Sequence, residues 1–265
     1  MISTHNLRSK FTNFSLLQIL AIIPARFAST RFPGKPLIDI GGKTMLQRVI
    51  EQARKSTALC DVVVATDDER IFSHVESLGE KVVMTSANHP SGTDRCLEAL
   101  NKFRKEVDAV INIQGDEPFV APEQIDALAE LISRDEVEIG TLAKKIDDSA
   151  TLFDSNKVKV IFSNNGRAVY FSRHAIPFQK GIEQANWLKH HAYYQHIGLY
   201  AYKVETLREI SALKPSPLEL AESLEQLRWL ENGKSIYVAE TKIETPAIDT
   251  KEDLAKVLAS YFGKS

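Results

Sequence analysis

Short apolar runs alternate with amphipathic segments through the first half of the chain. The apolar runs are rich in β-branched residues, as buried strands are. They cover residues 19–23, 62–65, 81–84, 109–113 and 138–143. Between them, apolar residues recur at helical spacing in residues 45–55, 69–78, 92–103 and 122–133. Strands that alternate with helices of this length predict βαβ units and a mostly parallel sheet, with right-handed crossovers.

The pattern changes after about residue 150. Strands are expected at residues 158–162, 168–171, 196–202 and near 235–239, and helices at 204–211, 217–231 and from Lys251 onward. The sequence Asn164-Asn165-Gly166 favours a hairpin turn between the first two of these strands. No low-complexity linker separates the two halves. We therefore expect an N-terminal extension over residues 1–17 and one domain over 18–265, with a small antiparallel insertion.

Composition narrows the class of protein. A chain of 265 residues with 43% hydrophobic content can bury a large core. The net charge of -2 argues against a nucleic-acid protein, which would normally carry a basic excess. The apolar run at residues 16–23 is too short to span a bilayer, so we expect no stable membrane association. Cys60 and Cys96 lack metal-ligand spacing and are predicted to be reduced, buried thiols of a cytoplasmic protein.

A basic loop follows the first predicted strand. Residues 22–36 read IIPARFASTRFPGKP and carry Arg26, Arg31 and Lys35 among glycine and prolines. Ligands of open α/β sheets bind beyond the carboxyl ends of the strands, so this loop is placed to hold a polyphosphate. The loop lacks both the GxGxxG fingerprint and the GxxxxGK[ST] phosphate loop, which counts against a dinucleotide oxidoreductase and an ordinary NTPase. The alternative is a basic surface loop without a ligand.

Two carboxylates are candidates for binding a metal. Asp116 follows the buried strand at 109–113 through Gly115, so it is aimed at the same edge of the sheet as the basic loop. A carboxylate beside bound phosphates is what Mg²⁺ needs. Asp249 precedes the last predicted helix and is the second candidate. The alternatives are a turn that needs Asp116 for backbone reasons and a helix N-cap at Asp249 or Thr250.

The sequence Ser91-Gly92-Thr93 leads into a predicted helix. Hydroxyl and N–H groups at such a position can hold a ribose, a base or a phosphate. Helix capping by Ser91 or Thr93 is the structural alternative, and both functions are compatible.

Seven segments occur together in the order and approximate spacing of one family. They read IIPARFASTRFPGKPL, SGTDR, NIQGDEP, YFSR, HIGLYAY, PSPLELAESLEQLR and IDTKEDL. From about residue 19 to the end, the chain resembles the 3-deoxy-manno-octulosonate cytidylyltransferases, or CMP-KDO synthetases. The resemblance implies an α/β, Rossmann-like nucleotide-diphospho-sugar transferase fold. It also implies a cytoplasmic homodimer that uses Mg²⁺ to make CMP-KDO and pyrophosphate from CTP and KDO for lipopolysaccharide synthesis.

The resemblance also assigns roles to individual residues. The catalytic group would be Arg26, Lys35 and Asp116. The nucleotide-binding residues would be Ala25, Arg26, Arg31, Lys35, Ser91, Gly92 and Thr93. The metal ligands would be Asp116 and Asp249. The residues that bind the sugar acid would be Gln114, Arg173, His196, Tyr200, Glu225 and Gln226.

Other functions stay open at this point. A cytidylyltransferase for 8-amino-KDO or sialic acid would share the CTP half of the site and differ in the sugar pocket. A metal-dependent glycosyltransferase would bind a nucleotide sugar through Asp116. A nucleotide-binding regulatory protein would keep the fold without turnover. No cysteine or serine nucleophile with a neighbouring base is recognisable, so we expect no covalent enzyme intermediate.

Overall fold

The computed structural model describes residues 17–28, 32–246, 248 and 250–263. Its strands are β1 (Ile19–Ala25), β2 (Asp61–Thr66), β3 (Lys81–Met84), β4 (Ala109–Asn112), β5 (Ile139–Ile146), β6 (Lys159–Phe162), β7 (Ala168–Ser172), β8 (Tyr193–Lys203) and β9 (Ile236–Thr241). Its α-helices are α1 (Met45–Ala53), α2 (Glu69–Ser77), α3 (Gly92–Lys102), α4 (Pro122–Ile132), α5 (Ser149–Phe153), α6 (Trp187–His190), α7 (Val204–Ser211), α8 (Pro217–Glu222), α9 (Glu225–Glu231) and α10 (Lys251–Tyr261). Two short 3-10 helices are η1 (Lys35–Leu37) and η2 (Gln184–Asn186).

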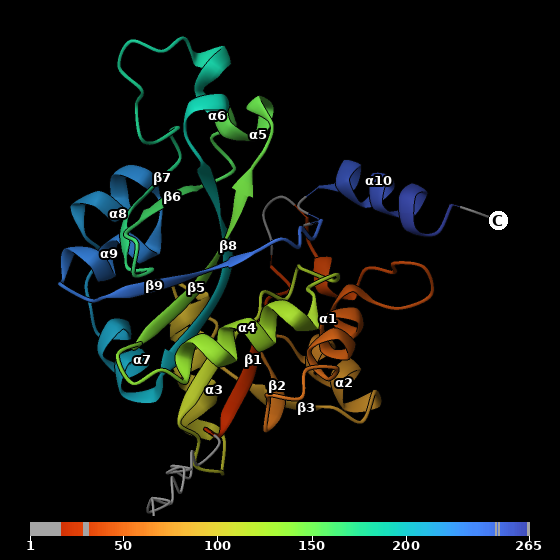
Figure 1. Cartoon of the computed structure of the whole chain (residues 1–265). Helices are drawn as coiled ribbons and strands as arrows, with labels where there is room; N and C mark the ends of the chain where they lie inside the picture. The colour runs from red at the N-terminus through yellow and green to blue at the C-terminus, as the bar shows by residue number, and fades with distance from the viewer. Residues whose placement is uncertain (1–16, 29–31, 247, 249, 264–265) are drawn as a thin grey trace, which may run out of the picture.

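The described strands form one twisted sheet whose main path runs β3-β2-β1-β4-β8-β5-β9 (Figure 1). The strands β1 to β4 pair in parallel, which confirms the βαβ units expected for the first half. Ile22 of β1 is paired with Asn112 of β4, so the loops that follow these two strands leave the sheet at the same edge. The α/β class and the largely parallel sheet flanked by helices are as predicted.

The antiparallel part of the sheet is built around β8. This long strand pairs antiparallel with both β4 and β5, while β9 returns parallel to β5. The predicted hairpin is confirmed, because β6 and β7 pair antiparallel across a turn in which Gly166 has φ 83°. Asn165 supports this turn by accepting a hydrogen bond from the N–H of Arg167 at 3.2 Å. The small antiparallel insertion expected from the sequence is therefore present.

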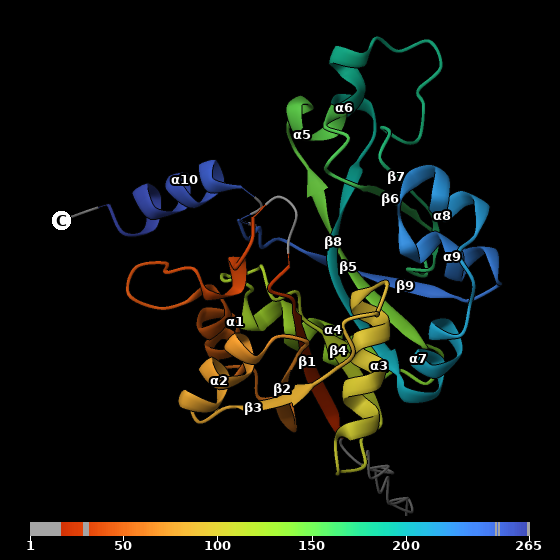
Figure 2. The ribbon, with the colours of Figure 1, turned by 180° about the vertical axis from the view of Figure 1, so that it is seen from behind.

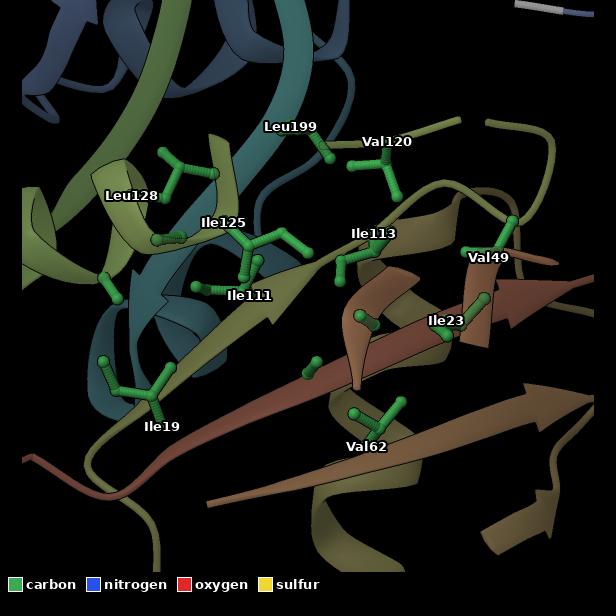
Figure 3. Close-up of a cluster of buried hydrophobic side chains, with 14 of the residues drawn as sticks. Ile19, Ile23, Val49, Val62, Ile111, Ile113, Val120, Ile125, Leu128 and Leu199 are labelled. Carbon is green, nitrogen blue, oxygen red and sulfur yellow. The ribbon is translucent and has the colours of Figure 1, made fainter. Parts of the chain in front are cut away.

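Both faces of the sheet carry a hydrophobic core. On β1, Ile19 and Ile23 pack into a cluster with α1, α2 and α4, while Leu20 and Ile22 face a second cluster with α3, α7 and α9. Figure 1 shows α1 and α4 over one face, and Figure 2 shows α3 over the other. Figure 3 shows the first cluster, where side chains from strands and helices interdigitate. Burial on both faces explains why β1 reads as a continuous apolar run.

One predicted helix is wrong in its extent. Residues 217–231 were expected to form a single helix, but the structure breaks it into α8 and α9. At the break, Ser223 adopts the left-handed conformation with φ 52° and ψ 49°. No glycine or proline marks this position, so local sequence gave no sign of the break.

Some further predictions concern single residues and the ends of the chain. Cys96 is buried as predicted, but Cys60 is exposed, so the prediction of two buried thiols is wrong for Cys60. Of the helices that the structure describes, none has the length and apolar character needed to cross a bilayer. Residues 1–16 of the expected N-terminal extension lie outside the described residues, and the division at residue 17 stays a prediction.

Candidate active site

Several described contacts position the part of the basic loop that leads into Lys35. The N–H of Gly34 donates to the carbonyl of Phe27 at 3.0 Å, which closes the loop. Gly34 has φ 72°, a conformation that glycine adopts without strain, and Pro36 is the second residue of the short helix η1, which begins at Lys35. The Phe27 ring is covered by the guanidinium of Arg70 at 3.3 Å from its centroid. These contacts fix the backbone that carries Lys35.

Lys35 and Asp116 form an ion pair at this edge of the sheet. The Lys35 Nζ lies 2.8 Å from Oδ2 of Asp116. The Lys35 side chain is 8% exposed, whereas that of Asp116 is 44% exposed. The lysine predicted to bind phosphate and the carboxylate predicted to bind metal are therefore adjacent, although they come from loops 81 residues apart in sequence.

Gly115 allows the Asp116 loop to approach β1. A Cβ atom at this position would lie 2.8 Å from the backbone carbonyl oxygen of Pro24, closer than any real contact of that kind. It would also lie 3.6 Å from the Cβ of Ala25, the last residue of β1. Only glycine lets the two loops lie this close without displacement. Sequence patterning placed Asp116 at the correct edge, and Gly115 sets its distance from the basic loop.

Arg26 connects the basic loop to the start of α3. Its Nη2 donates to the carbonyls of His89 at 2.7 Å and Ser91 at 3.1 Å. Burial lowers the pKa of Arg26, and the nearby cation Arg95 lowers it further. Ser91 is the N-cap of α3 and accepts from the N–H of Asp94 at 3.1 Å. The structural alternative for Ser91 is therefore correct, and its backbone also belongs to the candidate site.

A buried ion pair behind Arg26 was not predicted from the sequence. Arg95 is completely buried, and its Nη2 donates to Oδ2 of Asp67 at 2.7 Å. Its Nη1 donates to the Thr85 hydroxyl at 2.5 Å. Asp67 follows β2 directly, and Asp116 comes four residues after the end of β4, so the argument used for Asp116 would also have identified Asp67. Through Asp67 and Thr85, Arg95 ties the ends of β2 and β3 to α3. These contacts support the start of α3, which contacts Arg26.

Thr93 and Glu225 join the predicted nucleotide side to the predicted sugar side. The Thr93 hydroxyl donates to Oε2 of Glu225 at 3.0 Å. The other carboxylate oxygen of Glu225 accepts from Nη2 of Arg228 at 3.3 Å. Burial raises the pKa of Glu225, while the Thr93 hydrogen bond and the Arg228 charge act in the opposite direction. Beside this carboxylate, Ser91, Glu225 and Arg228 help to line an open groove of about 520 Å³.

His196 and Tyr200 lie on β8 with their rings 5.3 Å apart. Burial lowers the pKa of His196 to about 3, so the imidazole is neutral at physiological pH. The Thr141 hydroxyl donates its one hydrogen to the carbonyl of Leu199 at 2.8 Å. It therefore accepts from Nε2 of His196 at 2.9 Å, which leaves Nδ1 of His196 as an acceptor. Burial also raises the pKa of Tyr200, which keeps its hydroxyl protonated.

The remaining predicted sugar ligands differ in their surroundings. Gln226 is buried at the start of α9, and Nε2 of Gln114 lies 3.5 Å from the carbonyl of Gly198. The described contacts of the Arg173 side chain are with backbone groups. Its guanidinium donates to the backbone carbonyls of Glu222 at 2.7 Å, Ser155 at 3.2 Å and Ser223 at 3.3 Å.

The structure thus brings most of the predicted residues into one region. Direct contacts link Lys35 to Asp116, Arg26 to Ser91, and Thr93 to Glu225. Gly92 lies beside Pro24, because a Cβ at Gly92 would be 3.5 Å from that proline ring. Two predicted residues, Arg31 and Asp249, lie outside the described residues.

The donor set at Asp116 fits Mg²⁺. Within the part of the chain that the structure describes, no three His, Cys, Asp or Glu side chains form a group that could hold a metal ion. Mg²⁺ typically takes only one or two carboxylates and completes its shell with phosphate oxygens and water. Asp116 is a half-exposed hard ligand beside the cation Lys35, so it can meet that requirement when a polyphosphate is bound.

Comparisons with known proteins identify the family of the chain. The model of the cytidylyltransferase family matches residues 20–236. A 3-deoxy-manno-octulosonate cytidylyltransferase of Cytophaga hutchinsonii is 56% identical over 244 residues, which cover 92% of this chain and 97% of the relative. The enzyme of the same name from Bacteroides thetaiotaomicron is 54% identical over 241 residues, which cover 90% of this chain and 96% of the relative.

Solved structures show the same fold. The structure of CMP:2-keto-3-deoxy-manno-octonic acid synthetase complexed with CTP has a TM-score of 0.85 and 39% sequence identity, and the match covers 91% of this chain and 97% of that one. A 4-diphosphocytidyl-2C-methyl-D-erythritol synthase from Anaerococcus prevotii has a TM-score of 0.61 at 16% identity, over 93% of this chain and 96% of that one. The second likeness concerns the fold alone.

Proposed function

This chain belongs to the 3-deoxy-manno-octulosonate cytidylyltransferase family, and from that premise we propose how its site works. The chain is a nucleotidyltransferase that transfers the cytidylyl group of CTP to KDO. The observation that carries our account of the site is the contact between Lys35 and Asp116 at the end of β1 and β4. A phosphate-binding cation and a metal-binding carboxylate are needed side by side for this chemistry.

The chemical difficulty is to bring a hydroxyl of a sugar acid to the α-phosphorus of a highly anionic triphosphate. Charge neutralisation and in-line positioning are therefore the main tasks of the protein. Lys35 is a compact cation in a mostly buried position, where its interaction with phosphate is weakly screened by water. Arg26 adds a second cation and ties the phosphate side to the start of α3 through Ser91. Both stabilise the charge that develops on the leaving pyrophosphate.

Asp116 is the residue that would hold Mg²⁺. When bound, Mg²⁺ neutralises phosphate oxygens and makes the α-phosphate more electrophilic. Asp116 is paired with Lys35, so a magnesium–triphosphate complex offers a partner to each of them: phosphate to the cation and metal to the carboxylate. Asp249 stays a prediction for the second carboxylate.

The residues proposed for the sugar side supply neutral and acidic hydrogen-bonding groups. Neutral His196 can accept one hydrogen bond through Nδ1, and the Tyr200 hydroxyl stays protonated. Glu225 and Gln226, at the start of α9, add a carboxylate and an amide. Such groups suit the several hydroxyls of a sugar acid, and Gln114 follows β4 just before Asp116.

The choice of acceptor tests the function. We expect pyrophosphate release from CTP and Mg²⁺ when KDO is supplied, and far slower release with sialic acid offered separately at the same concentration. The 8-amino analogue of KDO, offered in a third sample, shows whether the sugar pocket accepts an amino group at position 8. Faster release with sialic acid than with KDO would contradict the assignment of the acceptor. Consumption of a nucleotide sugar without pyrophosphate release would instead favour the glycosyltransferase alternative.

The assembly state and the compartment remain proposals. We propose a homodimer, and α8 offers apolar surface for it, since Leu218 is 38% and Leu220 is 69% exposed. Light scattering at micromolar concentration should give the mass of two chains. The mass of one chain, unchanged on tenfold concentration, would contradict the dimer. Location in the cytoplasm is proposed from the family resemblance alone.

A further inference from the structure

The break between α8 and α9 is held in a strained conformation. Ser223 has φ 52° and ψ 49°, and it is the one non-glycine residue with positive φ in the described part of the chain. A residue with a Cβ adopts this left-handed conformation at a cost in energy, so the surrounding structure must enforce it. The break lies two residues before Glu225, which carries the contact to Thr93.

The break decides which way Glu225 points. In an uninterrupted helix, Glu222 and Glu225 would be three residues apart and share one face. Glu222 faces β7, where its Oε1 accepts from the Ser172 hydroxyl at 2.7 Å. Glu225 instead faces α3 and accepts from Thr93. The left-handed residue therefore turns the start of α9 away from β7 and toward the site.

Arg173 is the group that holds this break. Its Nε donates to the carbonyl of Glu222 at 2.7 Å, and its Nη2 donates to the carbonyl of Ser223 at 3.3 Å. The backbone N–H of Arg173 donates to Oε2 of Glu222 at 2.9 Å. The planar guanidinium thus binds two successive carbonyls of the break from the end of β7. In Figures 1 and 2, α8 and α9 lie beside β6 and β7, as this contact requires.

Lys159 in turn anchors Arg173. The Lys159 side chain is completely buried, and its Nζ donates to the carbonyl of Arg173 at 2.6 Å. The other two donors of the ammonium bind the carbonyls of Asp154 at 2.8 Å and Lys157 at 2.6 Å. An ammonium has three N–H groups, so all of them are satisfied. The third contact of the Arg173 guanidinium is to the carbonyl of Ser155, which lies in the same short segment as Asp154 and Lys157.

We propose that Arg173 is a positioning residue of the sugar side, which acts through the backbone of Glu222 and Ser223 rather than by binding the sugar carboxylate. It stabilises the left-handed conformation of Ser223 and so directs Glu225 and Gln226 into the site. Lys159 supports it by fixing its backbone. The inference rests on the proposed sugar pocket and replaces the role in direct binding that the family resemblance implies for Arg173.

Glycine at position 223 separates positioning from direct binding. Arg173→Met should raise the KM for KDO about tenfold or more and change the KM for CTP much less, because charged hydrogen bonds to the break are lost. Glycine adopts the left-handed conformation without strain. Adding Ser223→Gly to Arg173→Met should therefore lower the raised KM for KDO most of the way back to the parent value. Ala221→Gly, at an exposed position of α8, is the matched control. Added to Arg173→Met, it should leave the raised KM for KDO unchanged.

Each outcome of this experiment is informative. Failure of Ser223→Gly to lower the raised KM would overturn positioning and return Arg173 to direct binding of the sugar acid. An equal rise in both KM values would show a general structural role and also contradict the proposal. If Arg173→Met does not fold, Arg173→Lys takes its place, with the same expected rescue. An inactive parent enzyme would count against the proposed function itself, so the two failures are distinguishable.

Discussion

Asp116→Asn should lower kcat about a thousandfold at saturating CTP, KDO and Mg²⁺, because the change removes the charge that a hard cation needs and keeps the shape of the side chain. The fold should remain, since the Asp116 side chain is 44% exposed and the asparagine amide oxygen can still accept a hydrogen bond from Lys35. The measurement is the initial rate of pyrophosphate release, with circular dichroism of the same sample. Asp135→Asn, at an exposed position after α4, is the control and should keep the parent rate.

The metal dependence refines this expectation. In the parent enzyme the rate should saturate with Mg²⁺ and disappear with a chelator. In Asp116→Asn the concentration of Mg²⁺ that gives half the maximal rate should rise, because one ligand is weakened. A folded variant with near-normal kcat and an unchanged Mg²⁺ dependence would remove Asp116 from the metal site.

Lys35→Met should have the second large effect, and it should act on CTP. Methionine fills a similar volume without the charge, so the loss of a weakly screened cation beside the triphosphate should lower kcat/KM for CTP by about a hundredfold to a thousandfold. The KM for KDO should change little, because the proposed role of Lys35 is to bind the phosphates of CTP. Steady-state kinetics with each substrate varied in turn give both values.

A matched lysine controls for the loss of charge. Lys55 is exposed at the end of α1, and Lys55→Met should leave both KM values unchanged. Should Lys35→Met lower only the melting temperature and keep the parent kcat/KM for CTP, Lys35 would be a structural residue of the basic loop.

Much of the site could be predicted because it follows from the order of strands. The apolar run of β1 and the apolar run of β4 each lead directly into a chemically active loop. Parallel strands end at the same edge of a sheet, so Lys35 and Asp116 could be expected close together, and they are in contact. Asp67 had the same signal after β2 and was overlooked. Its partner Arg95 could not be identified, because a buried cation on a helix resembles a solvated one in sequence.

What escaped prediction depends on contacts between distant residues. The left-handed Ser223 has no local signal, since glycine or asparagine would be the usual residue there. It is held by Arg173, which is 50 residues away in sequence. The state of His196 was equally out of reach, because its neutral form follows from burial and its tautomer from the Thr141 hydroxyl on the neighbouring strand β5. Direct binding by Arg173 is what the family resemblance implies, whereas its described contacts favour positioning.

The most direct test of the central claim measures both products in one sample. The parent enzyme is incubated with CTP, KDO and Mg²⁺, and CMP-KDO and pyrophosphate are quantified together by mass spectrometry and an enzyme-coupled assay. Our account requires equal amounts of the two products, and neither of them when KDO or Mg²⁺ is omitted. Pyrophosphate without CMP-KDO, or no consumption of CTP by the folded protein, would contradict cytidylyl transfer to KDO at this site.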